Sequence, residues 1–152
     1  MKIFDLNVNN FCGPDHEKDW QTCCKSEEQK LQDKVLGDVI SKIDVEKPDI
    51  IVFQEFDVNA PAGKKAVRRL GERKYRPVYP NQENEISGNY SITMIFVKEI
   101  EVVPDKSPEV MKYRWCVIKI GDLTTLGVHA PLENKYRKPE DVQKFFDALK
   151  NM

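Results

Sequence analysis

The sequence predicts an α/β (α+β) domain in which a mixed β-sheet carries its helices on one face. The four apolar residues 50 to 53 follow a Pro-Asp pair and form a run that is too short for a helix. The run is also too apolar for a half-exposed strand, so it indicates a central strand covered on both faces. Amphipathic helical patterns flank this strand, and strand patterns dominate from residue 75 onward.

Length and charge limit the class of protein. A chain of 152 residues is expected to form a single domain, 1–152. Its 24 basic and 25 acidic residues give a net charge of -1, so no global field attracts nucleic acid or a membrane surface. No apolar run approaches the roughly 20 residues of a membrane span, and the first ten residues are too polar for a signal peptide. We therefore expect a cytoplasmic protein with no membrane partner.

The first strand is expected near residues 2 to 9, where Phe4, Leu6 and Val8 alternate with more polar residues. Polarity rises toward its end, which places Asn7 and Asn9 at a rim rather than in the core. Two asparagines at a strand end also indicate a turn. Residues 12 to 25 are interpreted as a loop.

Two helices are predicted around the central strand. The first begins at Ser26, which forms a capping-box pattern with Gln29, and it ends before Pro48. Its inward positions are expected to be Leu31, Val35, Val39, Ile40 and Ile43. The second helix is expected over Pro61–Lys74, with Ala66, Val67 and Leu70 inward. Its opposite face is basic, which is typical of a solvated surface but would also suit contact with phosphates.

The remaining chain is predicted to be mostly strands. They are expected at Tyr75–Tyr79, Ser91–Lys98, Arg114–Ile120 and Leu123–His129. Gly121-Asp122 separates the last two strands as a two-residue hairpin connection. A final helix begins at Pro139, and its inward residues are expected to be Val142, Phe145, Phe146 and Leu149.

The four cysteines are few for this length and fit a reducing compartment. Cys12, Cys23 and Cys24 lie close to His16 in the sequence, but their spacing matches no common zinc pattern. We expect no zinc site there.

Four segments together resemble the endonuclease/exonuclease/phosphatase superfamily, which includes deoxyribonuclease I. They are LNVNNF at 6 to 11, PDIIVFQE at 48 to 55, SITMIFVK at 91 to 98 and LGVHAP at 126 to 131. Each is weak alone, but all four occur in the family's order. The resemblance implies half of a four-layer αββα sandwich and metal-dependent hydrolysis of phosphodiester or phosphomonoester bonds.

The resemblance also implies site residues. By position, Glu55 would hold a weakly bound Mg²⁺ (or Mn²⁺), Asn7 would help to organise the attacking group, and His129 would contact the phosphate. Asn9 and Gln54 would be further phosphate-contacting or supporting residues. The residue types suit this chemistry, because magnesium prefers carboxylate oxygens together with water and substrate phosphate. A structural histidine is the alternative interpretation of His129.

The resemblance covers only about the first half of the family's domain. The second half would bring a Gly-Asp-x-Asn motif and a terminal Asp-His pair that activates water. Gly121-Asp122-Leu123-Thr124 is superficially similar to the first motif, but it lacks the Asn and precedes the histidine strand, so we interpret it as the hairpin turn. The only histidines are His16 and His129. The expected site is therefore incomplete.

Because the predicted strands are apolar on both faces, a sheet with helices on one side would expose a large apolar patch. We expect a covering layer from a second copy in a homodimer, from a complementing second half, or from the chain's own 12–25 segment or last helix.

Three functions remain open from the sequence. The chain could be a phosphoesterase completed by a second chain, with nucleic acid or a phosphorylated small molecule as substrate. It could instead be an inactive relative that binds nucleic acid or protein with the same surface. The third alternative is a truncated product or fragment without activity of its own.

Overall fold

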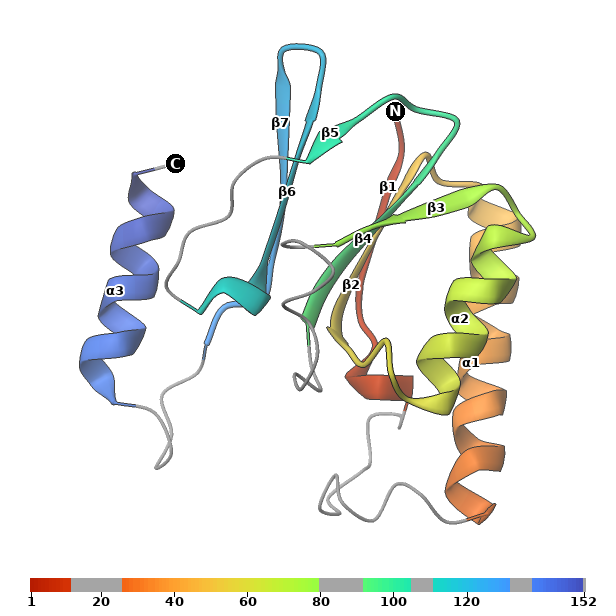
Figure 1. Ribbon diagram of the computed structural model, residues 1–152. Coiled ribbons are helices and arrows are strands. Elements are labelled where there is room, and N and C mark those ends of the chain that lie inside the picture. Colours follow the sequence, from red (N-terminus) through yellow and green to blue (C-terminus); the bar gives the residue numbers. More distant parts are fainter. Residues whose placement is uncertain (12–25, 80–91, 105–110, 132–137, 152) are drawn as a thin grey trace.

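The computed structural model describes residues 1–11, 26–79, 92–104, 111–131 and 138–151. Two sheets and three helices make up this part of the chain (Figure 1). One sheet has the strand order β1 (Ile3–Asn7), β2 (Ile50–Phe56), β4 (Ile92–Lys98) and β3 (Tyr75–Val78). The other has the order β5 (Val103–Pro104), β6 (Trp115–Ile120) and β7 (Leu123–Val128). The helices are α1 (Ser26–Glu46), α2 (Pro61–Gly71) and α3 (Pro139–Lys150). The mixed α/β class expected from the sequence is confirmed.

The four-stranded sheet is organised around β2, which pairs with β1 in parallel and with β4 in antiparallel orientation. Its side chains alternate between two cores. Ile51, Phe53 and Phe96 lie in the core beneath α1 and α2, where Leu36, Ile40 and Leu70 pack against the sheet. Phe53 makes edge-to-face contacts with Phe11 and Phe96 at ring-centroid distances of 6.0 and 5.6 Å. The buried aromatic cluster fixes the helical layer on this face.

The opposite face of the same sheet is covered by β5, β6 and β7 of the chain itself. Ile50, Val52 and Ile95 form a second core with Cys116 and Ile118 of β6. The covering layer was expected from a second copy, from a complementing second half, from the 12–25 segment or from the last helix. The chain's own hairpin supplies it instead, because β6 and β7 form a separate sheet rather than extending the first one. The apolar face therefore gives no reason for a partner.

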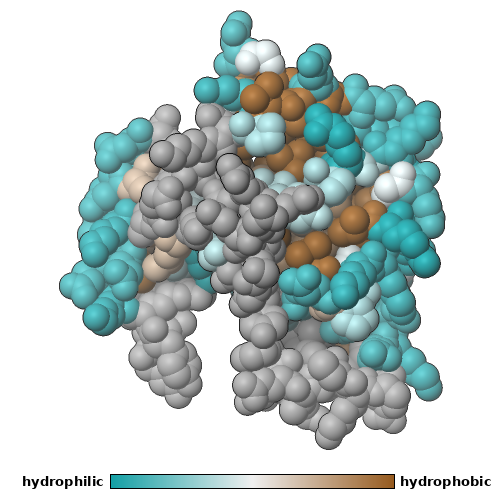
Figure 2. Space-filling model, viewed as in Figure 1, coloured by the Kyte–Doolittle hydropathy of each residue, from teal (hydrophilic) through white to brown (hydrophobic). Residues whose placement is uncertain are grey.

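Helix α3 forms the fourth layer, outside the second sheet (Figure 1). The indole of Trp115 in β6 stacks on the ring of Phe145 at a centroid distance of 4.2 Å. Val142 and Phe145 are buried as expected, but Phe146 is exposed and makes a T-shaped contact with the ring of Phe145. Leu31 of α1 is also exposed, because Gln32, Leu36 and Ile40 form the buried line of that helix. Figure 2 shows hydrophilic outer surfaces on the helices and hydrophobic surface over the strands between them.

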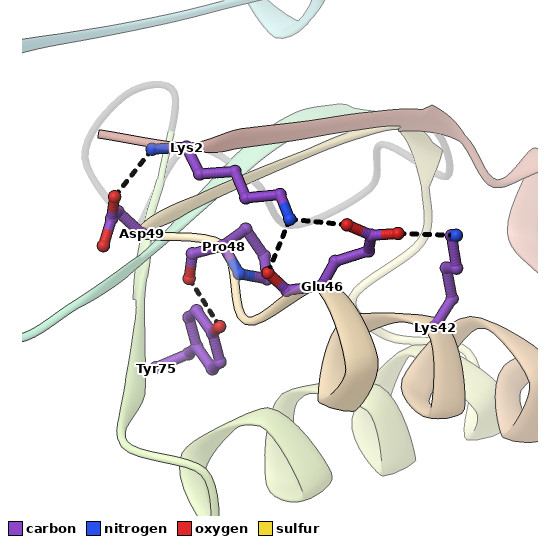
Figure 3. A network of polar contacts seen from close by, with 6 residues as sticks. All are labelled: Lys2, Lys42, Glu46, Pro48, Asp49 and Tyr75. Atoms are coloured by element: carbon purple, nitrogen blue, oxygen red, sulfur yellow. Dashed lines mark hydrogen bonds and ion pairs between the residues drawn. The ribbon is translucent and has the colours of Figure 1, made fainter.

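A polar network joins the first strand to the end of α1 (Figure 3). The Lys2 ammonium donates to the carboxylate and the main-chain carbonyl of Glu46, and Lys42 forms a second ion pair with that carboxylate. The Lys2 amide donates to Asp49, and the Tyr75 hydroxyl donates to the Pro48 carbonyl at 2.6 Å. These bonds hold the entrance of β2 beside β1.

Some cations of the expected basic helix face are paired within the chain. Lys65 of α2 forms an ion pair with Asp33 of α1 at 2.7 Å, and Arg73, which follows the end of α2 at Gly71, forms one with Asp44 at 2.6 Å. Such pairs compete with external phosphates, so this face fits the interpretation as a solvated surface. Within the described ranges, no helix combines the length and the apolar character needed to cross a membrane.

Candidate functional site

A β-bulge at the end of β2 determines where Glu55 lies. Phe53 pairs with Met94 and Phe56 pairs with Ile92, so two residues of β2 occupy the space opposite the single residue Thr93. Phe53 and Phe56 both belong to the core beneath the helices. Strict alternation would have turned position 55 into that core as well. The bulge instead places both Gln54 and Glu55 on the face toward the second sheet.

The backbone of Glu55 adopts a left-handed conformation, with φ 51°. Few residues with a Cβ adopt this region, and those that do are often found where the surrounding structure enforces a functional geometry. The turn that follows is fixed by the Asp57 carboxylate, which accepts hydrogen bonds from the Asn59 and Ala60 amides at 2.8 and 3.1 Å. The bulge is therefore held between the β2–β4 ladder and the beginning of α2.

The bulge brings Glu55 to His129, which follows directly after β7 in the other sheet. The Nε2 atom of His129 lies 3.4 Å from Oε1 of Glu55. The His129 side chain is 21% exposed and the Glu55 side chain 32% exposed, so both reach solvent at the surface of the sandwich. Two residues that are distant in sequence and belong to different sheets thus form one polar site.

Arg114 is a third member of this site that sequence reasoning missed. Its Nη1 lies 2.9 Å from Nδ1 of His129 and donates to the His129 carbonyl at 3.1 Å. The main chains are also joined, because the His129 amide donates to the Arg114 carbonyl at 2.9 Å. The hydroxyl of buried Thr93 donates to the same carbonyl at 3.1 Å. The histidine is therefore anchored by its backbone and contacted at both ring nitrogens.

The asparagines lie at the same end of the first sheet, as expected. Asn7 pairs with Gln54 in the β1–β2 ladder, one position before Glu55. Its Oδ1 accepts a hydrogen bond from the Asn9 amide at 3.0 Å, which forms the turn that a pair of asparagines indicates. Asn7 thus lies at the edge of the site, and Asn9 helps to build the turn beside it.

The side chain of Gln54 bonds to the neighbouring strand β1 rather than to Glu55 or His129. Its Nε2 donates to Oδ1 of Asp5 at 3.0 Å. Burial raises the pKa of the Asp5 carboxyl, and a hydrogen bond from the Leu6 backbone partly opposes this effect. Asp5 is the second residue that sequence reasoning missed, although alternation in β1 places it on the same face as Asn7.

The donor set at this end suits only a weakly held divalent ion. Among the described residues, no three His, Cys, Asp or Glu side chains gather closely enough to form a metal cluster. Glu55 supplies one partly exposed carboxylate. Mg²⁺ retains several waters and is often bound through one or two carboxylates plus substrate phosphate, so Glu55 fits a minimal ligand set for this ion.

The sequence also drew attention to the cysteines, to His16 and to the Gly121-Asp122 pair. Cys12, His16, Cys23 and Cys24 lie outside the described residues, so the absence of zinc there stays a prediction. Cys116 is buried between the sheets, where burial raises the pKa of its thiol to about 12. A thiol with such a pKa is unreactive near neutral pH. Gly121-Asp122 forms the β6–β7 hairpin turn as predicted, with Gly121 at φ 57°.

The arrangement of two packed sheets between helical layers is also found in solved structures of another protein. No protein-family model matches the sequence, and no curated protein sequence matches it significantly. Two crystal structures of TDP2 from Caenorhabditis elegans, one of them of the selenomethionine protein, match with TM-scores of 0.54 and 0.53. Each has 16% identity and covers 99% of this chain but 42% of the TDP2 chain.

TDP2 is a DNase I-like enzyme of the endonuclease/exonuclease/phosphatase superfamily. At this identity the likeness establishes the fold alone. It confirms that the chain has the DNase I-like fold implied by the four sequence segments, and that it corresponds to part of the TDP2 fold. The chain spans about two fifths of the length of the structures it matches.

Proposed function

We propose that the chain is the metal- and phosphate-binding half of a magnesium-dependent phosphoesterase whose site is completed by a second polypeptide. The observation that carries this proposal is the 3.4 Å approach of Glu55 to His129 at the end of the sandwich where Asn7 also lies. The bulge and the left-handed conformation of Glu55 produce this approach. The DNase I-like fold supports the assignment to phosphoester chemistry.

Each residue has a role that suits its chemistry. Glu55 would hold Mg²⁺ or Mn²⁺, and the bound ion would supply electrostatic polarisation of a phosphoryl oxygen. The Nε2 side of His129 would donate to a phosphate oxygen and stabilise charge that develops there. Asn7 would orient the phosphate with its amide N–H, because its Oδ1 is engaged by Asn9.

A second polypeptide enters the proposal because the described part of the chain offers no residue at this end to activate water. The simplest partner is a second copy of the same chain, and a separate complementing half is the alternative. Since the apolar sheet face is already covered, we expect the partner beside edge strand β1, whose Ile3 and Asn7 are exposed. Nucleic acid or a phosphorylated small molecule would be the substrate.

Hydrolysis of bis(p-nitrophenyl) phosphate with Mg²⁺, measured over a range of protein concentrations, tests the proposal. The chain alone at low concentration should be slow, because the loss of a general base costs about 10²- to 10⁴-fold. Activity per molecule should rise with concentration if a second copy completes the site. Glu55→Gln and Asn7→Ala should abolish the activity. Sedimentation of the same samples reports the dimer.

Glu99→Gln is the matched control, because Glu99 also has positive φ and its carboxylate also lies 3.4 Å from a side-chain nitrogen, Nζ of Lys74. It should keep the activity. Turnover that survives both Glu55→Gln and Asn7→Ala would place the site elsewhere and refute the proposal.

The lack of a cluster of three metal-ligating side chains among the described residues favours a second candidate function, an inactive relative that binds a phosphorylated ligand through the same residues. Binding of a 5′-phosphorylated oligonucleotide that is weakened by His129→Gln, without turnover at any protein concentration, would support this candidate.

A further inference from the structure

Both nitrogens of the His129 ring have a neighbour whose hydrogen-bonding capacity is fixed. A guanidinium has only N–H donors and remains charged in proteins, so it cannot accept a proton from Nδ1. A carboxylate has only acceptor oxygens when it is ionised. Arg114 lies at Nδ1 and Glu55 lies at Nε2.

These two contacts select the same tautomer of the imidazole. At 2.9 Å from the Arg114 nitrogen, Nδ1 must accept the hydrogen bond and must therefore carry no proton. A neutral ring then holds its proton on Nε2, the nitrogen that lies 3.4 Å from the acceptor atom Oε1 of Glu55. The opposite tautomer would set two N–H groups against each other and a lone pair against a carboxylate.

We propose that Arg114 is a positioning residue that fixes His129 as the Nε2–H tautomer, with this proton directed at the Glu55 side of the site. The inference rests on the proposed function for one point only, the role of this proton. In the proposed function, the Nε2–H of His129 would donate to a phosphate oxygen of the substrate. The location of the proton itself follows from the contacts alone. It can therefore be tested without any turnover.

The ring position does not depend on the Arg114 side chain alone. The amide of His129 donates to the Arg114 carbonyl, and this bond remains when the side chain is changed. Trp115 and Val128 continue the same ladder in the next pair. Substitution of the guanidinium therefore changes the partner of Nδ1 while the backbone continues to hold the histidine.

Long-range ¹H–¹⁵N NMR of the imidazoles tests the proposal, because protonated and unprotonated ring nitrogens have well-separated shifts. The chain contains only two histidines, so a His16→Gln background leaves a single ring to observe. Spectra are recorded at about pH 8.5, above the ordinary histidine pKa of about 6.5. The parent should show Nε2 protonated and Nδ1 unprotonated.

The contribution of Arg114 is separated from that of Glu55 by working in a Glu55→Gln background, since a glutamine amide can donate or accept. The Glu55→Gln variant should keep Nδ1 of His129 unprotonated. The double variant Glu55→Gln/Arg114→Gln should show a mixture of both tautomers. Arg76→Gln is the matched control, because Arg76 is an exposed arginine that donates to the Ile100 carbonyl. It should leave the His129 signals unchanged.

Each other outcome contradicts the proposal. A parent with a proton on Nδ1, alone or on both nitrogens, would show that Arg114 does not donate to the ring. Identical His129 signals with and without Arg114→Gln would show that Arg114 does not set the tautomer. If Arg114→Gln impairs folding, as far-ultraviolet circular dichroism would show, the parent spectrum still decides the location of the proton. A correct tautomer together with turnover that survives both Glu55→Gln and Asn7→Ala would refute the proposed function and leave this inference standing.

Discussion

Replacement of Glu55 by glycine and by alanine should reverse the usual order of stability of these two residues in a strand. Position 55 has φ 51°, where a Cβ meets the following carbonyl oxygen and costs roughly 1–2 kcal/mol that glycine avoids. In an ordinary strand, glycine is instead less stable than alanine by about 0.5–1 kcal/mol. At the middle of the two ranges, Glu55→Gly is more stable than Glu55→Ala by about 0.75 kcal/mol.

Thermal unfolding measures this difference directly. For a chain of this size, 1 kcal/mol corresponds to a change in Tm of about 2–4 °C, so the glycine variant should unfold roughly 1–4 °C higher than the alanine variant. Thr124 is the matched strand position, because it is exposed on β7 and its φ is not positive. At position 124 the alanine variant should have a higher Tm than the glycine variant. An alanine variant that is equal to or more stable than glycine at position 55 would refute the left-handed bulge that turns Glu55 toward His129.

Three further predictions concern the packing and the charges of the fold. Phe53→Ala should lower the free energy of unfolding by about 3–5 kcal/mol in urea titrations, because the ring is fully buried among other aromatic rings; a loss below about 1 kcal/mol would contradict that packing. Gly127→Val should cost about 1–3 kcal/mol, because a Cβ at Gly127 would lie 2.9 Å from Val52 Cγ1 across the two sheets; a neutral effect would show that the sheets do not pack face to face. The hydrogen bonds from Lys2 and then Lys42 hold the pKa of Glu46 at about 2, below its ordinary 4.5. This contribution to stability is present above pH 4.5 and is lost as the pH falls toward 2, so the urea midpoint of the parent should fall more steeply over that range than that of Glu46→Gln. Parallel curves would show that the Lys2 contact does not form in solution.

The sequence was sufficient to predict most of the elements, because their signals are local. The apolar run of β2, the alternation in β4 and the two-residue turn at Gly121-Asp122 are each carried by a few consecutive residues. The separation of β6 and β7 into their own sheet carries no such local signal. It depends on the fit of Gly127 and Cys116 against the face formed by Val52 and Ile95, which only the packed structure shows.

Part of the candidate site also carries no local signal in the sequence. The resemblance suggested Glu55, His129 and Asn7 as candidates, but strict alternation would have put Glu55 on the face of β2 that turns away from His129. The bulge turns Glu55 to the other face. It depends on the pairing of Phe56 with Ile92 in β4, which the sequence of β2 alone does not predict. The position of Arg114 beside His129 could have been predicted from the sequence. Counting outward from the two-residue turn pairs Ile120 with Leu123, and the same register places Arg114 opposite His129.

The central claim is that Glu55 holds a divalent ion beside His129, and titration with paramagnetic Mn²⁺ tests it most directly. A manganese ion bound at Glu55 should broaden the imidazole signals of His129 at low Mn²⁺ concentrations, in the parent and in Glu99→Gln alike. Glu55→Gln should largely remove the broadening. Equal broadening in parent and Glu55→Gln, or an unaffected His129 signal at millimolar Mn²⁺, would contradict the account.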